Sequence, residues 1–203
     1  MNNIILIGSG GHTAACIDVI EFSKQYKIVG LIQKDNIKEQ FKLKYPILGS
    51  DGDLIKIRKE FNNALITIGQ IKSPEPRVRL YQIIKNLGFK IPVILSPISY
   101  VSKTAIIGDG TIIMHGAIIN ANVIIGKNCI INNNALIEHD VTIGDHCHIS
   151  TGAIINGGVS IGNQTFIGSG VVTKQSISIG DNCVIAAGLI LKKNIGSSKV
   201  INN

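Results

Sequence analysis

The second half of the chain repeats with a period of six residues, and this repeat restricts the possible folds more than any other feature. Cut in sixes from residue 106, the sequence reads IIGDGT, IIMHGA, IINANV, IIGKNC, IINNNA, LIEHDV, TIGDHC and onward to ILKKNI, without an insertion. The second position of each hexad is isoleucine from Ile107 to Ile185, apart from Thr173, and the sixth position is small or aliphatic. This alternation predicts very short β-strands, which can bury their apolar side chains only by coiling upon one another.

A second period of eighteen residues indicates how many strands make one coil. Glycine occupies the third position of every third hexad, at Gly108, Gly126, Gly144, Gly162 and Gly180. Eighteen residues per coil correspond to three sides, so the sequence predicts a triangular parallel β-helix of five coils. Its core is a ladder of isoleucines, each contributing about 1.5–3 kcal/mol on burial.

The N-terminal part follows a different pattern, and the composition changes at about residue 95. An apolar strand, NNIILIG, leads through the turn SGGH into the helix TAACIDVIEFSKQ and a second strand, KIVGLIQ. This is a βαβ unit, which ALITIGQ and a helix containing EPRVRLYQIIK extend to about half a Rossmann fold. We therefore expect a small Rossmann-like α/β domain over residues 1–95 and a parallel β-helix over residues 96–203.

The turn SGGH has the properties of a phosphate site. It places backbone N–H groups from Gly8 to His12 at the start of a helix, where the helix dipole favours an anion. A complete GxGxxG motif is absent, so a dinucleotide-binding Rossmann domain is not indicated.

Composition excludes several classes of protein. A 203-residue chain with 45% hydrophobic and 16% charged residues is typical of a globular protein. The sequence has neither a long apolar span nor a signal peptide, so we expect a cytoplasmic protein that does not enter a membrane. The net charge of +7 is not accompanied by basic clusters interleaved with aromatic rings, which argues against nucleic-acid binding. Cys129, Cys147 and Cys183 share one sixth-position column, so we expect small, reduced core residues.

The hexads and the N-terminal half together resemble the sugar acetyltransferases of the PglD and NeuD type, which carry a left-handed β-helix. The resemblance implies the left hand of the coil and direct acetyl transfer from acetyl-CoA to a sugar amine. It also implies that the N-terminal domain holds a nucleotide-linked sugar. The residues that match this substrate-binding role are Gly8, Ser9, Gly10, His12, Asp35, Gly69 and Arg77.

The best candidate for catalysis is His139 in LIEHDV. It occupies the fourth position of its hexad, at a corner outside the core, where other coils carry Asp, Lys, Asn or Ser. An imidazole there can accept a proton at neutral pH. The resemblance implies that His139 is the general base and Asp140 its orienting carboxylate, with Glu138 as the alternative.

Two further residues complete the predicted catalytic group. The resemblance places Asn132 near the acceptor. Gly157 follows His139 by one coil, and its backbone N–H is expected to meet the thioester oxygen. A glycine at this position is equally suited to a tight turn with a positive φ.

The resemblance further implies that acetyl-CoA lies along a groove between β-helices. The residues expected to contact it are His148, Gly157, Gly168, Ser169 and Ala186. His148 lies half a coil from His139, so a homotrimer would allow His148 of one subunit to approach His139 of the next.

His115 and His146 are expected at the plain surface. The chain departs from the family pattern at Ser96, where relatives carry histidine, and in its tail KKNIGSSKVINN, where relatives have Gly-x-Pro-Ala.

Two rival hypotheses remain beside the enzyme. Carbonic anhydrases on the same fold bind zinc through three histidines, but the spacing of the histidines here differs, so we expect no metal. The other rival is a non-catalytic sensor of nucleotide sugars or a partner protein.

The preferred substrate of the enzyme is a nucleotide-linked, UDP-type 4-amino-4,6-dideoxy sugar, similar to a bacillosamine precursor, used in bacterial glycan biosynthesis. The alternative substrate is a free sialic-acid-like sugar that is acetylated at oxygen.

Overall fold

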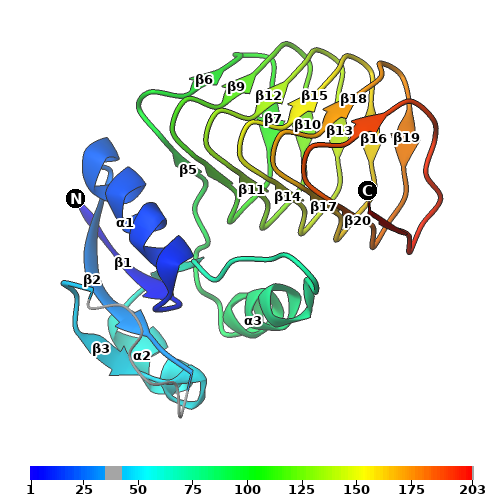
Figure 1. Ribbon diagram of the computed structural model, residues 1–203. Coiled ribbons are helices and arrows are strands. Elements are labelled where there is room, and N and C mark those ends of the chain that lie inside the picture. Colours follow the sequence, from blue (N-terminus) through cyan, green and yellow to red (C-terminus); the bar gives the residue numbers. More distant parts are fainter. Residues whose placement is uncertain (35–42, 203) are drawn as a thin grey trace.

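The computed structural model describes residues 1–34 and 43–202. Asp35, predicted to bind substrate, lies outside the described residues. An N-terminal α/β domain packs against one side of a parallel β-helix (Figure 1). None of the helices in the described part has the length and apolar character needed to cross a membrane.

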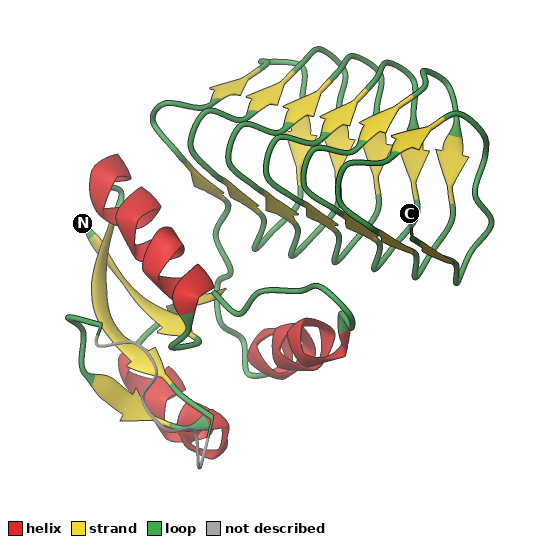
Figure 2. Ribbon diagram, viewed as in Figure 1, coloured by secondary structure: helices red, strands yellow, loops and turns green. Residues whose placement is uncertain are grey.

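The N-terminal domain is a parallel sheet covered by helices on both faces (Figure 2). The sheet has the strand order β3-β2-β1-β4, with the bounds β1 Asn2–Ile7, β2 Tyr26–Ile32, β3 Ile47–Gly49 and β4 Asn63–Ile66. The helices are α1 Gly11–Ser23, α2 Leu54–Glu60 and α3 Glu75–Asn86, with a 3-10 turn, η1, over Asp51–Asp53. Alternate side chains of β1 enter two cores, Ile4 and Leu6 toward α1, Ile5 and Ile7 toward α2 and α3, which gives its continuous apolar sequence.

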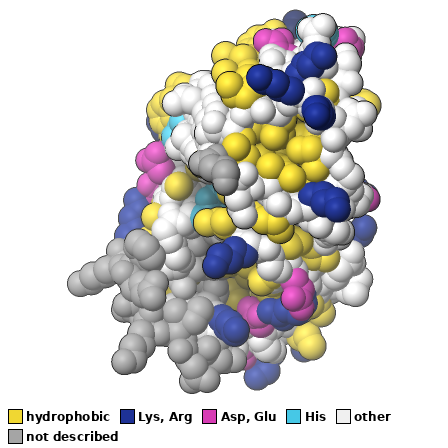
Figure 3. All heavy atoms as spheres, turned by 45° about the vertical axis from the view of Figure 1, so that its right-hand side comes forward, with side chains coloured by type: hydrophobic (Ala, Val, Ile, Leu, Met, Phe, Trp, Pro, Cys, Tyr) yellow, Lys and Arg dark blue, Asp and Glu magenta, His cyan; other side chains and the backbone are white. Residues whose placement is uncertain are grey.

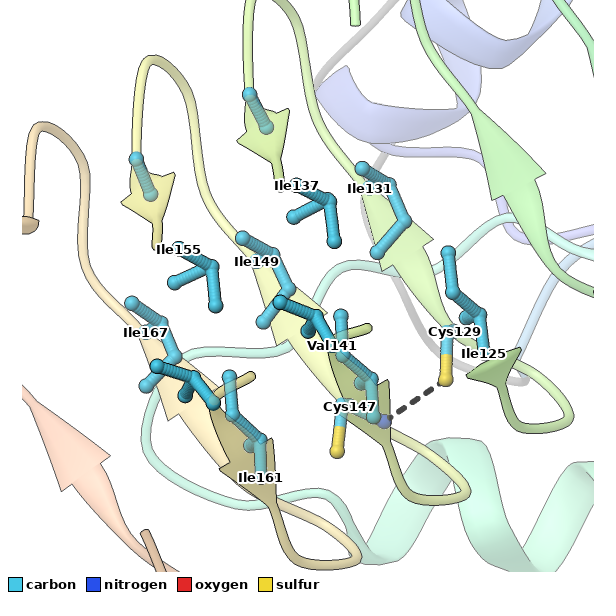
Figure 4. Close-up of a cluster of buried hydrophobic side chains, with 14 of the residues drawn as sticks. Ile125, Cys129, Ile131, Ile137, Val141, Cys147, Ile149, Ile155, Ile161 and Ile167 are labelled. Carbon is cyan, nitrogen blue, oxygen red and sulfur yellow. Dashed lines mark hydrogen bonds between the residues drawn. The ribbon is translucent and has the colours of Figure 1, made fainter. Parts of the chain in front are cut away.

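The predicted β-helix is confirmed, and it is left-handed. Its strands are two residues long and, as far as Leu191, pair in parallel with the strands eighteen residues before and after, so that Ile124 lies between Ile106 and Thr142. The last strand pairs at a spacing of sixteen residues, Val184 with Val200. The isoleucines at the second hexad position from Ile113 onward are buried inside the coils as predicted (Figure 4), and Ile107 is partly buried against them. Three sheets form the three sides.

The first side, here called the domain-facing sheet, contacts the N-terminal domain. Its strands are β5 Ile94–Leu95, β8 Ile112–Ile113, β11 Ile130–Ile131, β14 His148–Ile149, β17 Phe166–Ile167, β20 Val184–Ile185 and β22 Val200–Ile201. The outward side chains of Ile94, Ile112 and Ile130 belong to the same core as α1. The predicted domain boundary at residue 95 stays a prediction.

The two remaining sides differ in their outward side chains. The apolar outer sheet consists of β6 Tyr100–Val101, β9 Ile118–Ile119, β12 Leu136–Ile137, β15 Ile154–Ile155, β18 Val172–Thr173 and β21 Ile190–Leu191. The mixed outer sheet consists of β7 Ile106–Ile107, β10 Ile124–Ile125, β13 Thr142–Ile143, β16 Ser160–Ile161 and β19 Ser178–Ile179. Figure 3 shows one face of the molecule on which hydrophobic side chains gather in a patch bordered by Lys and Arg.

The glycines of the eighteen-residue period are needed because successive coils touch. A Cβ on Gly126 would lie 2.7 Å from backbone atoms of the next coil. The fifth position of each hexad from Gly110 to Gly188 instead takes a positive φ, a conformation that favours Gly and Asn. Asp140 occupies this position in its hexad and has a φ of 59°.

The cysteines are confirmed as reduced core residues. All four are free and buried. The thiols of Cys129 and Cys147 donate to the carbonyl oxygens of Gly144 and Gly162, at 3.1 and 3.0 Å, as the Thr111 hydroxyl donates to Gly126. This column, which repeats every eighteen residues from Thr111 to Cys183, therefore favours a side chain that is both small and able to donate a hydrogen bond.

Two histidines expected at the plain surface are part of the domain interface instead. His146 is buried at 8% exposure, with Nδ1 2.9 Å from Asn128 Nδ2 and its ring against Tyr81. His115 contacts Asp18 of α1 through Nε2 at 2.9 Å and the Ser96 hydroxyl through Nδ1 at 2.6 Å. The N-terminal domain covers these early coils, which the six-residue pattern alone does not indicate.

Candidate active site

A cavity of about 580 Å³, here called the loop cavity, opens at the carboxyl ends of β1 and β4. This edge of a parallel sheet is the usual position of a ligand site. Five predicted substrate-binding residues line it: Gly8, Ser9, Gly10, His12 and Gly69.

The backbone of the turn explains why glycine is needed in the loop cavity. Gly8 has a φ of 139°, and a Cβ there would lie 2.9 Å from the Thr13 hydroxyl. Helix α1 begins at Gly11 with neither a side-chain cap nor an acidic residue in its first turn. Its first N–H groups are therefore available to an anion, as the sequence predicts for a phosphate.

Charged side chains border the same cavity. Lys34 and Glu75 line it, as do Arg79 and Asp51, which form a 2.8 Å ion pair. The Arg79 side chain remains half exposed. The cavity thus offers a basic group to a phosphate and paired polar groups to a base or ribose.

A second cavity of about 860 Å³, the interdomain cavity, lies between the N-terminal domain and the domain-facing sheet. Its wall contains Asn132 and four of the residues predicted to contact the coenzyme, His148, Gly168, Ser169 and Ala186. His12 and Gly69 line both cavities. Ligands bound in the two cavities would therefore meet at these two residues.

His148 is fixed at this junction by two hydrogen bonds. Its Nδ1–H donates to the carbonyl oxygen of Gln70 at 2.7 Å, so Nε2 accepts from Asn132 Nδ2 at 3.2 Å. Burial lowers the pKa of His148 to about 4, and the nearby Arg77 lowers it further against the opposing effect of the Gln70 bond. Burial, Arg77 and His148 lower the pKa of His12 to about 3. Both rings are therefore neutral at physiological pH.

His139 lies at the corner between the apolar and mixed outer sheets, directly after β12. Its Nδ1 is 2.8 Å from Asp140 Oδ2, and Asn122 Nδ2 donates to Asp140 Oδ1 at 3.0 Å. The hydrogen bond from His139 lowers the pKa of Asp140 most, and the hydrogen bond from Asn122 lowers it further. Glu138 accepts from Asn120 instead, at 3.0 Å.

Gly157 contacts this histidine, one coil along. A Cβ on Gly157 would lie 2.8 Å from His139 Cε1 and Nε2. Gly157 is not among the residues with a positive φ, so the tight-turn explanation of this glycine is wrong. Space for the imidazole is what requires it.

The predicted residues thus form two groups. His139, Asp140, Glu138 and Gly157 belong to the edge opposite the domain-facing sheet, whereas Asn132, His148 and the other predicted residues of both cavities lie on the domain-facing side. Among residues 1–34 and 43–202, His, Cys, Asp and Glu side chains do not form a group of three or more that could hold a metal ion.

Known protein families match both parts of the chain. Residues 3–84 match the PglD N-terminal domain. Residues 104–139, 125–157 and 140–175 match the bacterial transferase hexapeptide of six repeats, and residues 158–193 match the hexapeptide repeat of succinyl-transferase. The chain is an acyltransferase with a PglD N-terminal domain and hexapeptide repeats. No curated protein sequence matches it.

Several solved structures share the whole architecture of this acyltransferase. PerB from Caulobacter crescentus, in complex with CoA and GDP-perosamine, has a TM-score of 0.91 at 26% identity, over 98% of this chain and 93% of that one. The acetyltransferase domain of PglB from Neisseria gonorrhoeae has a TM-score of 0.89 at 25% identity, over 98% and 96%. WeeI from Acinetobacter baumannii, at 21% identity and a TM-score of 0.85 over 100% and 97%, shares the fold.

Arg77 does not occupy the position predicted for it in the acyltransferase. The residue is 1% exposed, and its guanidinium donates to the carbonyl oxygens of Ile68 and Asn128, at 2.6 and 2.8 Å. Burial lowers the pKa of Arg77 to about 10, which leaves the side chain charged at neutral pH. Arg77 joins the end of β4 to the second coil and does not line the loop cavity.

Gln70 is a site residue that the sequence pattern did not single out. It lines the interdomain cavity, is 3% exposed, and neither Nε2 nor Oε1 has a hydrogen-bond partner among the described residues. Leaving such a group unpaired costs about 1–3 kcal/mol. The available signal was its position, directly after Gly69 at the carboxyl end of a strand.

Proposed function

We propose that this acyltransferase transfers the acetyl group of acetyl-CoA to the 4-amino group of a nucleotide-linked 4-amino-4,6-dideoxy sugar, most readily a UDP sugar of the bacillosamine type. The observation that carries this proposal is the meeting of two cavities at His12 and Gly69. The loop cavity suits a nucleotide diphosphate, and the interdomain cavity suits the arm of the coenzyme. PerB binds CoA and GDP-perosamine, which supports this assignment of the two ligands.

The proposed site is completed by a second subunit. His139 lies on the edge opposite the two cavities, so one chain cannot bring it to the junction. The outward column of the apolar outer sheet, beside His139, is apolar in each of its strands, and Tyr100, Ile118 and Ile190 in it are 59%, 41% and 66% exposed. We infer a homotrimer in which this sheet is covered and His139 of one subunit faces the cavities of its neighbour.

Acetyl transfer then follows from the positions of the donors and acceptors. Asp140 accepts the Nδ1–H of His139, which leaves Nε2 free to take the proton of the sugar amine as its nitrogen attacks the thioester carbonyl. The Gly157 N–H stabilises the tetrahedral oxyanion, for which one donor is typically worth about 2.7–4 kcal/mol. The carbon–sulfur bond breaks, and the protonated His139 returns the proton to the coenzyme thiolate. The reaction is proposed to take place in the cytoplasm.

A panel of acceptors tests the function. Purified protein with acetyl-CoA is offered UDP-, GDP- and dTDP-linked 4-amino sugars and a free sialic acid, while thiol release and product mass are followed. We expect an N-acetylated nucleotide sugar, with UDP as the preferred nucleotide. Turnover with the free sugar alone would support the O-acetyltransferase instead, and nucleotide-sugar binding without acetyl transfer would support the sensor.

A further inference from the structure

The interdomain cavity has a polar end and an apolar end. His12, Gln70, Asn132 and His148 gather where it meets the loop cavity, since Asn132 and the Gln70 backbone both bond His148, whose ring centroid lies 6.5 Å from that of His12. Farther along the coils, the outward residues that line the cavity are Phe166, Val184 and Val200. A hydroxylated sugar suits the polar end, and the largely aliphatic pantetheine arm suits the rest.

At the polar end, the side chain of Gln70 differs from its neighbours. His148 bonds Gln70 and Asn132, and His12 Nε2 lies 3.5 Å from Cys16 Sγ. The Gln70 carboxamide is buried, yet both of its ends are unpaired in the described part of the chain. An apolar side chain of the same shape would be tolerated at least as well, so folding stability does not account for an amide here.

We propose that Gln70 is a specificity-determining residue for the acceptor, whose carboxamide turns into the polar end and bonds a hydroxyl group on the sugar ring beside the amine. This inference rests on the proposed function. A hydroxyl both donates and accepts, and a carboxamide offers one donor face and one acceptor face to match it. The side-chain torsions of glutamine allow this turn while the Gln70 carbonyl stays bonded to His148.

Two acceptors and two variants test the proposal. The acceptors are a nucleotide 4-amino sugar and its analogue without the hydroxyl next to the amine. Gln70→Met removes the carboxamide and keeps the shape, and Gln82→Met makes the same change at an exposed position of α3. We expect the unmodified enzyme and Gln82→Met to prefer the hydroxylated acceptor by on the order of tenfold to a hundredfold in kcat/KM. Gln70→Met should lose this preference, while the KM for acetyl-CoA stays within about twofold.

Stability and a conservative variant separate this role from a structural one. The Tm of Gln70→Met should be unchanged or higher, because an unpaired amide has been removed. Gln70→Asn, which keeps the amide on a shorter arm, should recover part of the preference. A Gln70→Met enzyme that keeps the preference, or in which the KM for acetyl-CoA rises instead, would overturn the proposal.

Binding measurements distinguish failure of this inference from failure of the proposed function. If the unmodified protein acetylates none of the nucleotide sugars, the proposed function fails. The same two sugars are then titrated by calorimetry. If the unmodified protein binds the hydroxylated sugar more tightly and Gln70→Met does not, the contact between Gln70 and the hydroxyl is still established. If each of the two proteins binds both sugars with equal affinity, the inference is refuted.

Discussion

The imidazole of His139 rests on Gly157 of the next coil, so closely that a Cβ on the glycine would lie 2.8 Å from Nε2. The other ring nitrogen, Nδ1, bonds Asp140, which Asn122 holds from the preceding coil. Three successive coils therefore fix one exposed side chain. The eighteen-residue period, whose first effect is to build a core, also positions this group.

Gly157→Ala should impair turnover without unfolding the β-helix. The added methyl group displaces the imidazole, and a misplacement of about 1 Å at a catalytic group is worth on the order of a hundredfold in rate. The kcat of Gly157→Ala should fall by tenfold to a hundredfold on this basis. Gly196→Ala, where a Cβ would meet nothing within 4 Å, is the matched control and should turn over normally. Equal kcat values in the two variants would show that the contact with His139 is unimportant.

The sequence predicts the β-helix well because its constraints are local and repeated. The ladder through Ile125, Ile143 and Ile161 follows directly from a strict period of eighteen residues. The positions of Arg77 and His146 do not follow from it, because both are buried by the contact between two domains far apart in the sequence. From sequence alone, a charged or polar residue on a helix or at a corner is predicted to be exposed, because the domain that covers it is not known.

The candidate site was predictable to a similar extent. The glycine turn and His139 are marked by residue types that suit few other positions, and both lie where the pattern places them. The residue type of Gln70 does not indicate a functional role. Only the absence of a hydrogen-bond partner for its buried side chain distinguishes it from other glutamines. That property belongs to the folded structure and cannot be read from the chain.

The trimer can be tested at the apolar outer sheet. Light scattering should give three chains of 21.7 kDa, or about 65 kDa. Ile118→Asp should weaken this assembly, since it places a charge in the face that we expect a neighbour to cover. Ile124→Asp changes a residue of similar exposure, 46% against 41%, on the mixed outer sheet and should leave the trimer intact. A monomer with full activity would contradict the shared site.

Acid should destabilise the fold through its buried histidines. The pKa of His148 is lowered to about 4 in the folded chain, against 6.5 without burial, so the unfolded chain binds more protons between these values. The contribution of each such ring to the free energy of unfolding is therefore complete above pH 6.5. It is lost as the pH falls toward 4, at about 1 kcal/mol per pH unit. His148→Gln removes this ring, so its free energy of unfolding should fall less between pH 6.5 and pH 4 than that of the unmodified protein. Parallel curves for the two proteins in denaturant titrations would refute the assignment.

His139→Ala tests the general base directly. The side chain is exposed at a corner and does not enter the isoleucine ladder, so the fold and the trimer should persist. Positioned acid–base catalysis is typically worth about 10²–10⁴-fold, and kcat should fall by that order while the affinities for acetyl-CoA and the nucleotide sugar change little.

Asp140→Asn should lower kcat less than His139→Ala does, because the imidazole remains and only its orienting carboxylate is lost. Raising the pH should partly rescue His139→Ala, since a sugar amine that is already deprotonated needs less help from a base. Profiles of kcat against pH for both variants beside the unmodified enzyme measure these differences. A His139→Ala enzyme within about threefold of normal at pH 7 would remove the base assignment, because so small a change is below what a proton acceptor contributes.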